Sequence, residues 1–150
     1  MAITLDGTNT EAETEPASSI TFARTTATGA NTGIVVTALC YGASNRATSG
    51  VTFNSDALTL LKQGDGNNNN ASIWFLPTPD VGAFNVVVTQ PGSASGVSGG
   101  AIAVFGVQQT TTADSTFGAS FSSDDRSSSI TTVADQCWIF DSIGDQSAAM

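Results

Sequence analysis

The sequence predicts an all-β protein, an antiparallel β-sandwich of the jelly-roll or immunoglobulin-like kind with about eight to ten short strands. Short runs of β-branched and aromatic residues recur along the whole chain, and turn-forming residues separate them. Thr, Ser, Gly and Asn make up 63 of the 150 residues, which is typical of a domain rich in turns. No window shows a helical period for longer than about two turns.

The first 18 residues are predicted to form an acidic arm or a long first loop, ahead of a single sandwich domain over residues 19–150. Residues 6–17 hold four of the thirteen acidic side chains and almost no large apolar ones. A chain of 150 residues is long enough for one domain with a substantial core.

Two runs in the first third of the chain predict strands in different environments. Residues 20–23 alternate apolar and small side chains, which fits a half-buried strand with Ile20 and Phe22 facing inward. Residues 33–42 form the clearest strand, and both of its faces are largely apolar. Such a strand is either central and covered on both sides or close to a subunit contact.

The middle of the chain predicts a hairpin followed by a surface loop. Residues 51–53 and 57–62 are its expected strands, joined by a three-residue turn at 54–56. Residues 63–70 are almost entirely Gly, Asn and Asp. Gly and Asn adopt positive φ readily, and Asn side chains bond to their own backbone, so this stretch predicts a loop.

The second half predicts six more strands separated by Pro, Gly, Ser and Thr. The first of them ends at Pro77 and Pro79, because proline cannot donate to a ladder. A stretch of Ser, Gly and Ala over residues 93–100 is expected to be a connection. The six predicted strands are residues 71–76, 82–89, 101–107, 117–121, 129–133 and 137–143.

The two cysteines lie in apolar, strand-like runs. The simpler interpretation is that Cys40 and Cys137 are buried thiols that behave as small hydrophobic residues. Their spacing leaves a disulfide open, because a bridge requires Cα atoms within roughly 7 Å of each other. Neither has a cation or a histidine beside it, so we expect no thiolate chemistry.

Composition excludes several classes of function. The chain has no histidine, which excludes Ser-His-Asp and Cys-His nucleophile systems and a His-ligated metal. Four basic side chains and a net charge of -9 do not match the phosphates of a nucleic acid. No apolar run approaches the ~20 residues that span a bilayer. We therefore expect neither a nucleic-acid nor a membrane partner.

The N-terminus has neither a basic region nor a long apolar stretch, so the sequence predicts no secretory signal. The expectation is synthesis in the cytosol, or a signal that was already removed and replaced by Met1.

Acidic side chains could act as metal ligands or as catalytic groups. In residues 63–70, Asp65 is the only carboxylate, and the spacing of a calcium loop is not met, so a flexible turn is the better interpretation. Asp124, Asp125 and Asp135 are a denser cluster, but the neighbouring Arg126 favours a solvated ion-pair network. We expect no catalytic, cofactor-binding or metal-ligating residue, and no cofactor.

Three aromatic residues could stack on a sugar ring if they were exposed. Tyr41, Trp74 and Trp138 all lie in apolar strand runs, however, so packing in the core is the better interpretation. Asn70 begins an N-glycosylation pattern, which we interpret as incidental without a secretory signal.

Four motifs follow one another along the chain: V-T-F-N-S-D-A-L-T at 51–59, W-F-L-P-T-P at 74–79, G-A-F-N-V-V-V-T at 82–89 and F-G-V-Q-Q-T at 105–110. In this order the chain resembles a β-sandwich domain that recurs in tailed-phage virion proteins and bacterial surface proteins. The similarity covers about residues 20–143 and is built from packing and turn residues. The resemblance implies no catalytic residues. Members often continue past the equivalent of Ile143, so either a neighbouring subunit supplies a closing strand or the sequence is a fragment.

From the resemblance and the composition we predict a non-enzymatic phage structural protein in the virion, a capsid decoration or fibre component on the outer surface that acts in a symmetric oligomer. The expected partners are the major capsid protein or other virion proteins, and further copies of the chain. One alternative is a host-adhesion module that binds surface glycans through loops 63–70 and 122–129. The other is a hydrolase that uses Asp124, Asp125 or Asp135.

Overall fold

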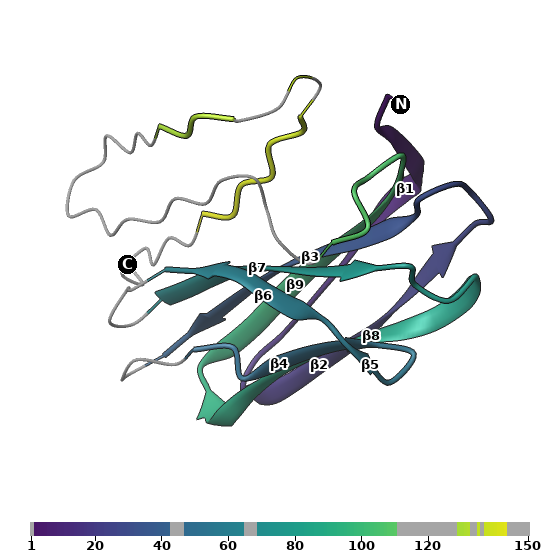
Figure 1. The fold of residues 1–150 in the computed structure, drawn as a ribbon. Helices are drawn as coiled ribbons and strands as arrows, with labels where there is room; N and C mark the ends of the chain where they lie inside the picture. Colours follow the sequence, from purple (N-terminus) through teal and green to yellow (C-terminus); the bar gives the residue numbers. More distant parts are fainter. Residues whose placement is uncertain are drawn as a thin grey trace.

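The protein is a sandwich of two antiparallel sheets (Figure 1), as the sequence predicts. The computed structural model describes residues 2–42, 47–64, 69–110, 129–132, 135 and 137–143. Over these residues the nine strands are β1 (Thr4–Thr14), β2 (Ala17–Thr26), β3 (Gly33–Tyr41), β4 (Gly50–Phe53), β5 (Asp56–Ala57), β6 (Thr59–Gln63), β7 (Asn69–Pro77), β8 (Gly82–Ala94) and β9 (Gly96–Phe105).

The strand order is that of a jelly roll. The five-stranded sheet runs β1-β9-β3-β7-β6, and the four-stranded sheet runs β2-β8-β4-β5. The first strand thus pairs with the last, and the second with the last but one, which is the nested pairing that two Greek keys produce. Of the two sandwich types that the sequence left open, the order selects the jelly roll, with β6 added at one edge.

The core lies between the sheets and is made by alternate residues of the inner strands. Ile34 and Val36 of β3 face Val86 and Val88 of β8, and all four are fully buried. Phe53 completes this core with its ring edge against Phe84, at a centroid distance of 5.7 Å. In β2, Ile20 and Phe22 are also buried here, which confirms the predicted inward face.

The N-terminal segment is a strand, so the prediction of an arm or a long first loop over residues 6–17 is wrong for most of its length. β1 pairs with β9 from Thr4 opposite Phe105 to Thr14 opposite Val97. Glu11 and Glu13 point to solvent while Ala12 packs against the core. An edge strand needs few apolar contacts with the core. Charged residues on its outer face therefore make it hard to recognise as a strand from the sequence.

The small residues before residue 101 also lie in a strand, and the prediction of a connection over 93–100 is wrong. Within β9, Gly96 lies beneath the ring of Tyr41, and a Cβ atom there would stand 2.2 Å from the Tyr41 Cζ. At Gly99, a Cβ atom would stand 3.3 Å from side-chain atoms of Ile20 and Val88 in the opposite sheet. Glycine is used at these positions because neighbouring side chains occupy the space of a Cβ.

The predicted hairpin exists, but its second strand is divided. β4 and β5 pair around a two-residue turn, Asn54 and Ser55, whose φ angles of 48° and 73° suit a tight hairpin. Leu58 then turns into the core and donates its N–H to the Val51 carbonyl at 2.9 Å. The chain therefore leaves the four-stranded sheet and continues as β6 in the other one.

Two further strands extend beyond their predicted ends. Asn69 and Asn70 belong to β7, so the expected loop over 63–70 is shorter, and its residues 65–68 lie outside the described part of the chain. β8 continues past Pro91 to Ala94. β4 reaches only as far as Thr89 along β8, so the proline removes no donor that β4 would use.

The last predicted strands are not strands where the structure describes them. Residues 129–132 and 137–143 have irregular backbone, and Ile139 and Ile143 are 65% and 66% exposed. The predicted strand over 117–121 lies outside the described residues. An apolar run becomes a strand only where a neighbouring strand offers its backbone, and both sheets are already assembled from residues 4–105.

One end of the core is polar and joins the two sheets. Arg24 faces inward from β2, and its guanidinium donates to the carbonyls of Asp6 and Thr8 at the bulge in β1. The Asp6 carboxylate accepts a bond from the Ala27 N–H at 2.7 Å. Burial lowers the pKa of Arg24, and the charge of Asp6 opposes that shift. Arg24 thus fixes the β1 bulge to the opposite sheet.

Replacing Arg24 by Ala should lower the free energy of unfolding by about 2 to 4 kcal/mol, because a buried and a partly buried carbonyl lose charged donors. Arg24→Lys should recover only part of this loss, since an ammonium cannot reproduce the planar fork. Urea denaturation followed by tryptophan fluorescence measures both. Thr25→Ala, at the next and exposed position of β2, is the matched control. If Arg24→Ala lowered the free energy of unfolding no more than Thr25→Ala does, this role of Arg24 would be contradicted.

Candidate functional site

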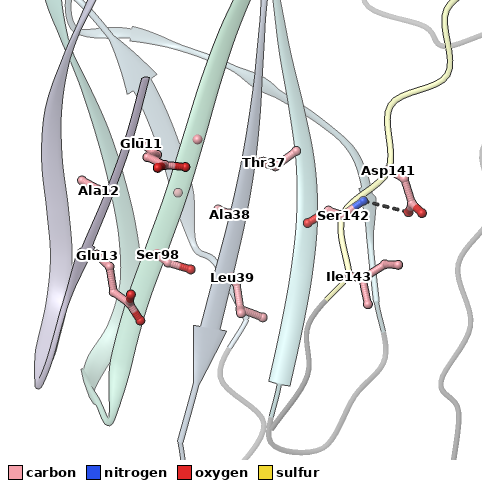
Figure 2. Close-up of a pocket in the computed structure, with 12 residues that line it drawn as sticks. Glu11, Ala12, Glu13, Thr37, Ala38, Leu39, Ser98, Asp141, Ser142 and Ile143 are labelled. Atoms are coloured by element: carbon pink, nitrogen blue, oxygen red, sulfur yellow. Dashed lines mark hydrogen bonds between the residues drawn. The ribbon is translucent and has the colours of Figure 1, made fainter. Parts of the chain in front are cut away.

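A hollow lies on the outer face of the five-stranded sheet, the face turned away from the four-stranded sheet. It has a volume of about 630 Å³ and is bounded by β1, β9, β3 and residues 141–143 (Figure 2). We call it the outer groove. Its lining consists of Glu11, Ala12, Glu13, Thr37, Ala38, Leu39, Ser98, Gly99, Gly100, Asp141, Ser142 and Ile143.

The outer groove is acidic at its rim and uncharged at its floor. Glu11 and Glu13 come from β1, and Asp141 comes from the C-terminal segment on the other side (Figure 2). Among the described residues, the lining includes no basic side chain and no thiol. The Asp141 carboxylate accepts a bond from the backbone N–H of its neighbour Ser142 at 2.8 Å. These groups can cradle a chain segment, but they do not pair a nucleophile with a base.

The rest of the outer face is apolar and is covered at one end by the chain that follows β9. Val35 and Phe75 point outward and are nevertheless buried. The N–H groups of Gly106 and Val107 donate to the Ala30 and Asn31 carbonyls, which brings the Val107 side chain over Gly33 and Phe75. β3 is therefore central and covered on both sides, the first of the two environments that its sequence predicts.

A row of polar side chains is buried inside the sandwich. The Trp74 indole N–H donates to the Ser72 hydroxyl at 2.9 Å, and Ser72 lies 3.1 Å from the Thr48 hydroxyl. Thr48 in turn lies 3.3 Å from the Cys40 sulfur. Burial raises the pKa of the Cys40 thiol, and the Thr48 bond offsets part of this effect. The row satisfies polar groups within the core, and it makes Cys40 a poor nucleophile.

The aromatic and cysteine predictions are confirmed in part. Trp74 and Cys40 are buried in the core as expected. Tyr41 is half-buried on Gly96, and Trp138 is 40% exposed, so the prediction of core packing is wrong for Trp138. Cys137 is half-buried rather than buried, and both cysteines are thiols.

The acidic candidates do not converge in the described part of the chain. Asp135 lies in an exposed turn, while Asp65, Asp124, Asp125 and Arg126 fall outside the described residues, as does most of the predicted loop 122–129. Among the residues that the structure describes, no three Asp, Glu or Cys side chains are placed to hold a metal ion. Asn70, the residue of the glycosylation pattern, is 1% exposed within β7.

The bonds from Arg24 to β1 were not predicted from the sequence, although a signal for them exists. Ile20, Phe22, Arg24 and Thr26 share one face of β2, so the alternation that places Ile20 and Phe22 in the core also places Arg24 there. A basic residue at an inward position requires buried acceptors. The Asp6 and Thr8 carbonyls that supply them lie in a segment predicted to be a loop.

No family model, curated protein or solved structure matches this chain. In the described ranges, no helix has the length and apolar character needed to cross a membrane.

In a Cys137→Ser variant, the remaining thiol at Cys40 should react with a disulfide reagent at pH 8 only as fast as the sandwich opens, at least roughly a hundredfold slower than in urea. Because burial raises the pKa of the Cys40 thiol in the folded state, the thiol of the unfolded chain ionises first as the pH rises. Stability should therefore be unaffected below about pH 8.5 and decline above it. Labelling kinetics followed by mass spectrometry make the measurement. Equal rates in native protein and in urea would show that Cys40 is not enclosed.

Proposed function

We propose that this protein is a non-enzymatic structural subunit of a phage virion, a capsid decoration or fibre component that works as a symmetric oligomer. The observation that carries the proposal is the jelly-roll strand order, an architecture used by viral capsid domains and by lectins. Because a fold by itself does not define a function, the surface chemistry and the sequence resemblance must also agree with the proposal.

The chemistry of the described residues supports a mechanical role. The outer groove combines carboxylates with Thr, Ser and Leu, and the buried polar row is enclosed in the core. Exposed apolar side chains are present at Leu5, Ile139 and Ile143. Such side chains are characteristic of surfaces that contact other protein chains. The resemblance of residues 51–110 to motifs of tailed-phage virion proteins indicates which assembly these contacts would serve.

Virions encoded by the same genome test the proposal directly. Density-gradient-purified particles, labelled with an antibody to this chain and imaged by electron microscopy, should carry the label in a regular array on the outer surface. Removal of the protein should leave the infection enzymes of the particle unaffected but lower its resistance to heat or chelators. Particles that lack the chain altogether would refute the proposal.

A glycan-binding adhesion module is the second candidate, and one observation favours it. Trp138 is 40% exposed and lies beside Phe140 at a ring-centroid distance of 6.3 Å. Exposed aromatic rings of this kind offer flat apolar surfaces on which a sugar can stack.

A glycan array distinguishes the two candidates. If the protein is an adhesin, it should bind a defined set of glycans, and Trp138→Ala should reduce that binding by roughly tenfold while leaving the fold intact. Phe84→Leu, a change in β8 rather than near Trp138, is the control for general destabilisation. Absence of binding to every glycan would remove this candidate.

A further inference from the structure

We propose that residues 137–143 of one copy pair as a β-strand with the free edge of β6 in a second copy. This inference rests on the proposed oligomeric function and names the contact that would build the oligomer. It joins a segment that the sequence predicts to be a strand with a sheet edge that the described strands leave open.

Residues 137–143, the donor of the proposed pair, have a sequence of high strand propensity but do not form a strand in the single chain. Residues 137–143 read C-W-I-F-D-S-I, and aromatic and β-branched residues of this kind are enriched in sheets. In the single chain this segment has irregular backbone and lies on the outer side of the five-stranded sheet (Figure 1). Trp138, Ile139 and Ile143 are 40%, 65% and 66% exposed. Pairing with a sheet would give this backbone a ladder and cover these side chains.

The acceptor follows from comparing the four sheet edges. The edges are β1 and β6 in one sheet and β2 and β5 in the other. β1 and β2 close one side of the sandwich against each other, and Arg24 already occupies the carbonyls of the β1 bulge. β5 has only two residues. β6 has five, and among the described strands it pairs with β7 alone, so it offers the longest open edge.

Charge also favours β6 and defines its partner. β6 carries Lys62, the only lysine of the chain, and residues 137–143 carry Asp141. A lysine and a bulge on an edge strand oppose pairing with an identical edge, because the bulge between Leu60 and Lys62 disturbs the ladder and the two lysines would repel. A donor with a carboxylate removes the charge repulsion, and the bulge remains as a local irregularity in the ladder. β1, by contrast, presents Glu11 and Glu13.

Charge does not favour the place that residues 141–143 occupy in the single chain. Asp141 and Ile143 border the outer groove, whose described lining holds Glu11 and Glu13 but no basic side chain. The bond that Asp141 makes there is to the backbone of its own neighbour, Ser142, which moves with it. Transfer to β6 of a second copy therefore breaks no ion pair among the described residues of the groove, and it brings Asp141 towards a lysine.

A charge exchange tests the contact. Lys62→Glu alone and Asp141→Lys alone should each weaken self-association by roughly fivefold or more in sedimentation equilibrium at low salt, and the double variant should restore it. Asp56→Lys, on the short edge strand β5, is the control and should leave association unchanged. A strictly monomeric wild type, or single variants that associate as well as the wild type, would overturn the proposal.

Disulfide trapping tests the same contact without relying on charge. In a Cys137→Ser background, chains carrying Lys62→Cys are mixed with chains carrying Asp141→Cys, so that a bridge between the new thiols can form only between copies. We expect a mixed dimer on mild oxidation, with Cys40 unreacted in the core. No mixed dimer, or a faster internal bridge when Glu11→Cys and Asp141→Cys share one chain, would show that the segment stays on its own groove. Particle labelling is independent of both tests, so the virion role and this contact can fail separately.

Discussion

The structure depends on the contact between the two inner sheet faces. Ile34 and Val36 in the five-stranded sheet meet Val86 and Val88 in the four-stranded sheet, and Phe53 fills the space beside them. Burial of these side chains, at about 25 cal/mol per Å² of apolar area, is the main force that holds the sheets together. The packing of the two sheets explains Gly99 in β9, where a Cβ would lie tightly against side chains of β2 and β8. At one end of the core, Arg24 satisfies the carbonyls of the β1 bulge.

The sequence predicts those parts of the fold in which side-chain alternation and burial coincide. The inward face of β2, the central position of β3 and the turn between β4 and β5 all follow from local patterns. β1 and the first half of β9 do not, because acidic or very small residues form strands there only when a neighbouring strand supplies the ladder. The strand over 137–143 was predicted from the same patterns, and its exposed side chains show that a pattern needs a pairing edge as well. The outer groove could not be predicted, since it brings residues 11–13 together with residues 141–143.

These features favour a protein that acts through its surfaces and strand edges. Its buried polar groups, Ser72, Thr48 and the Cys40 thiol, satisfy one another inside the core, where they contribute to a defined packing. The charged groups of the described residues face solvent, apart from Asp6 and Arg24 at the end of the core. A jelly roll with an outer face covered at one end, one closed side and, among the described strands, an open edge at β6 is suited to making a directed contact with a neighbour.

Hydrogen–deuterium exchange, compared between dilute and assembled protein, tests this account most directly, because it reports the backbone bonds that a new strand pair would create. The amides of β6 and of residues 137–143 should become protected together on assembly, while those of β3 and β8 remain protected in both states. Unchanged exchange in β6 and in residues 137–143, with protection appearing elsewhere, would contradict an assembly built on this edge.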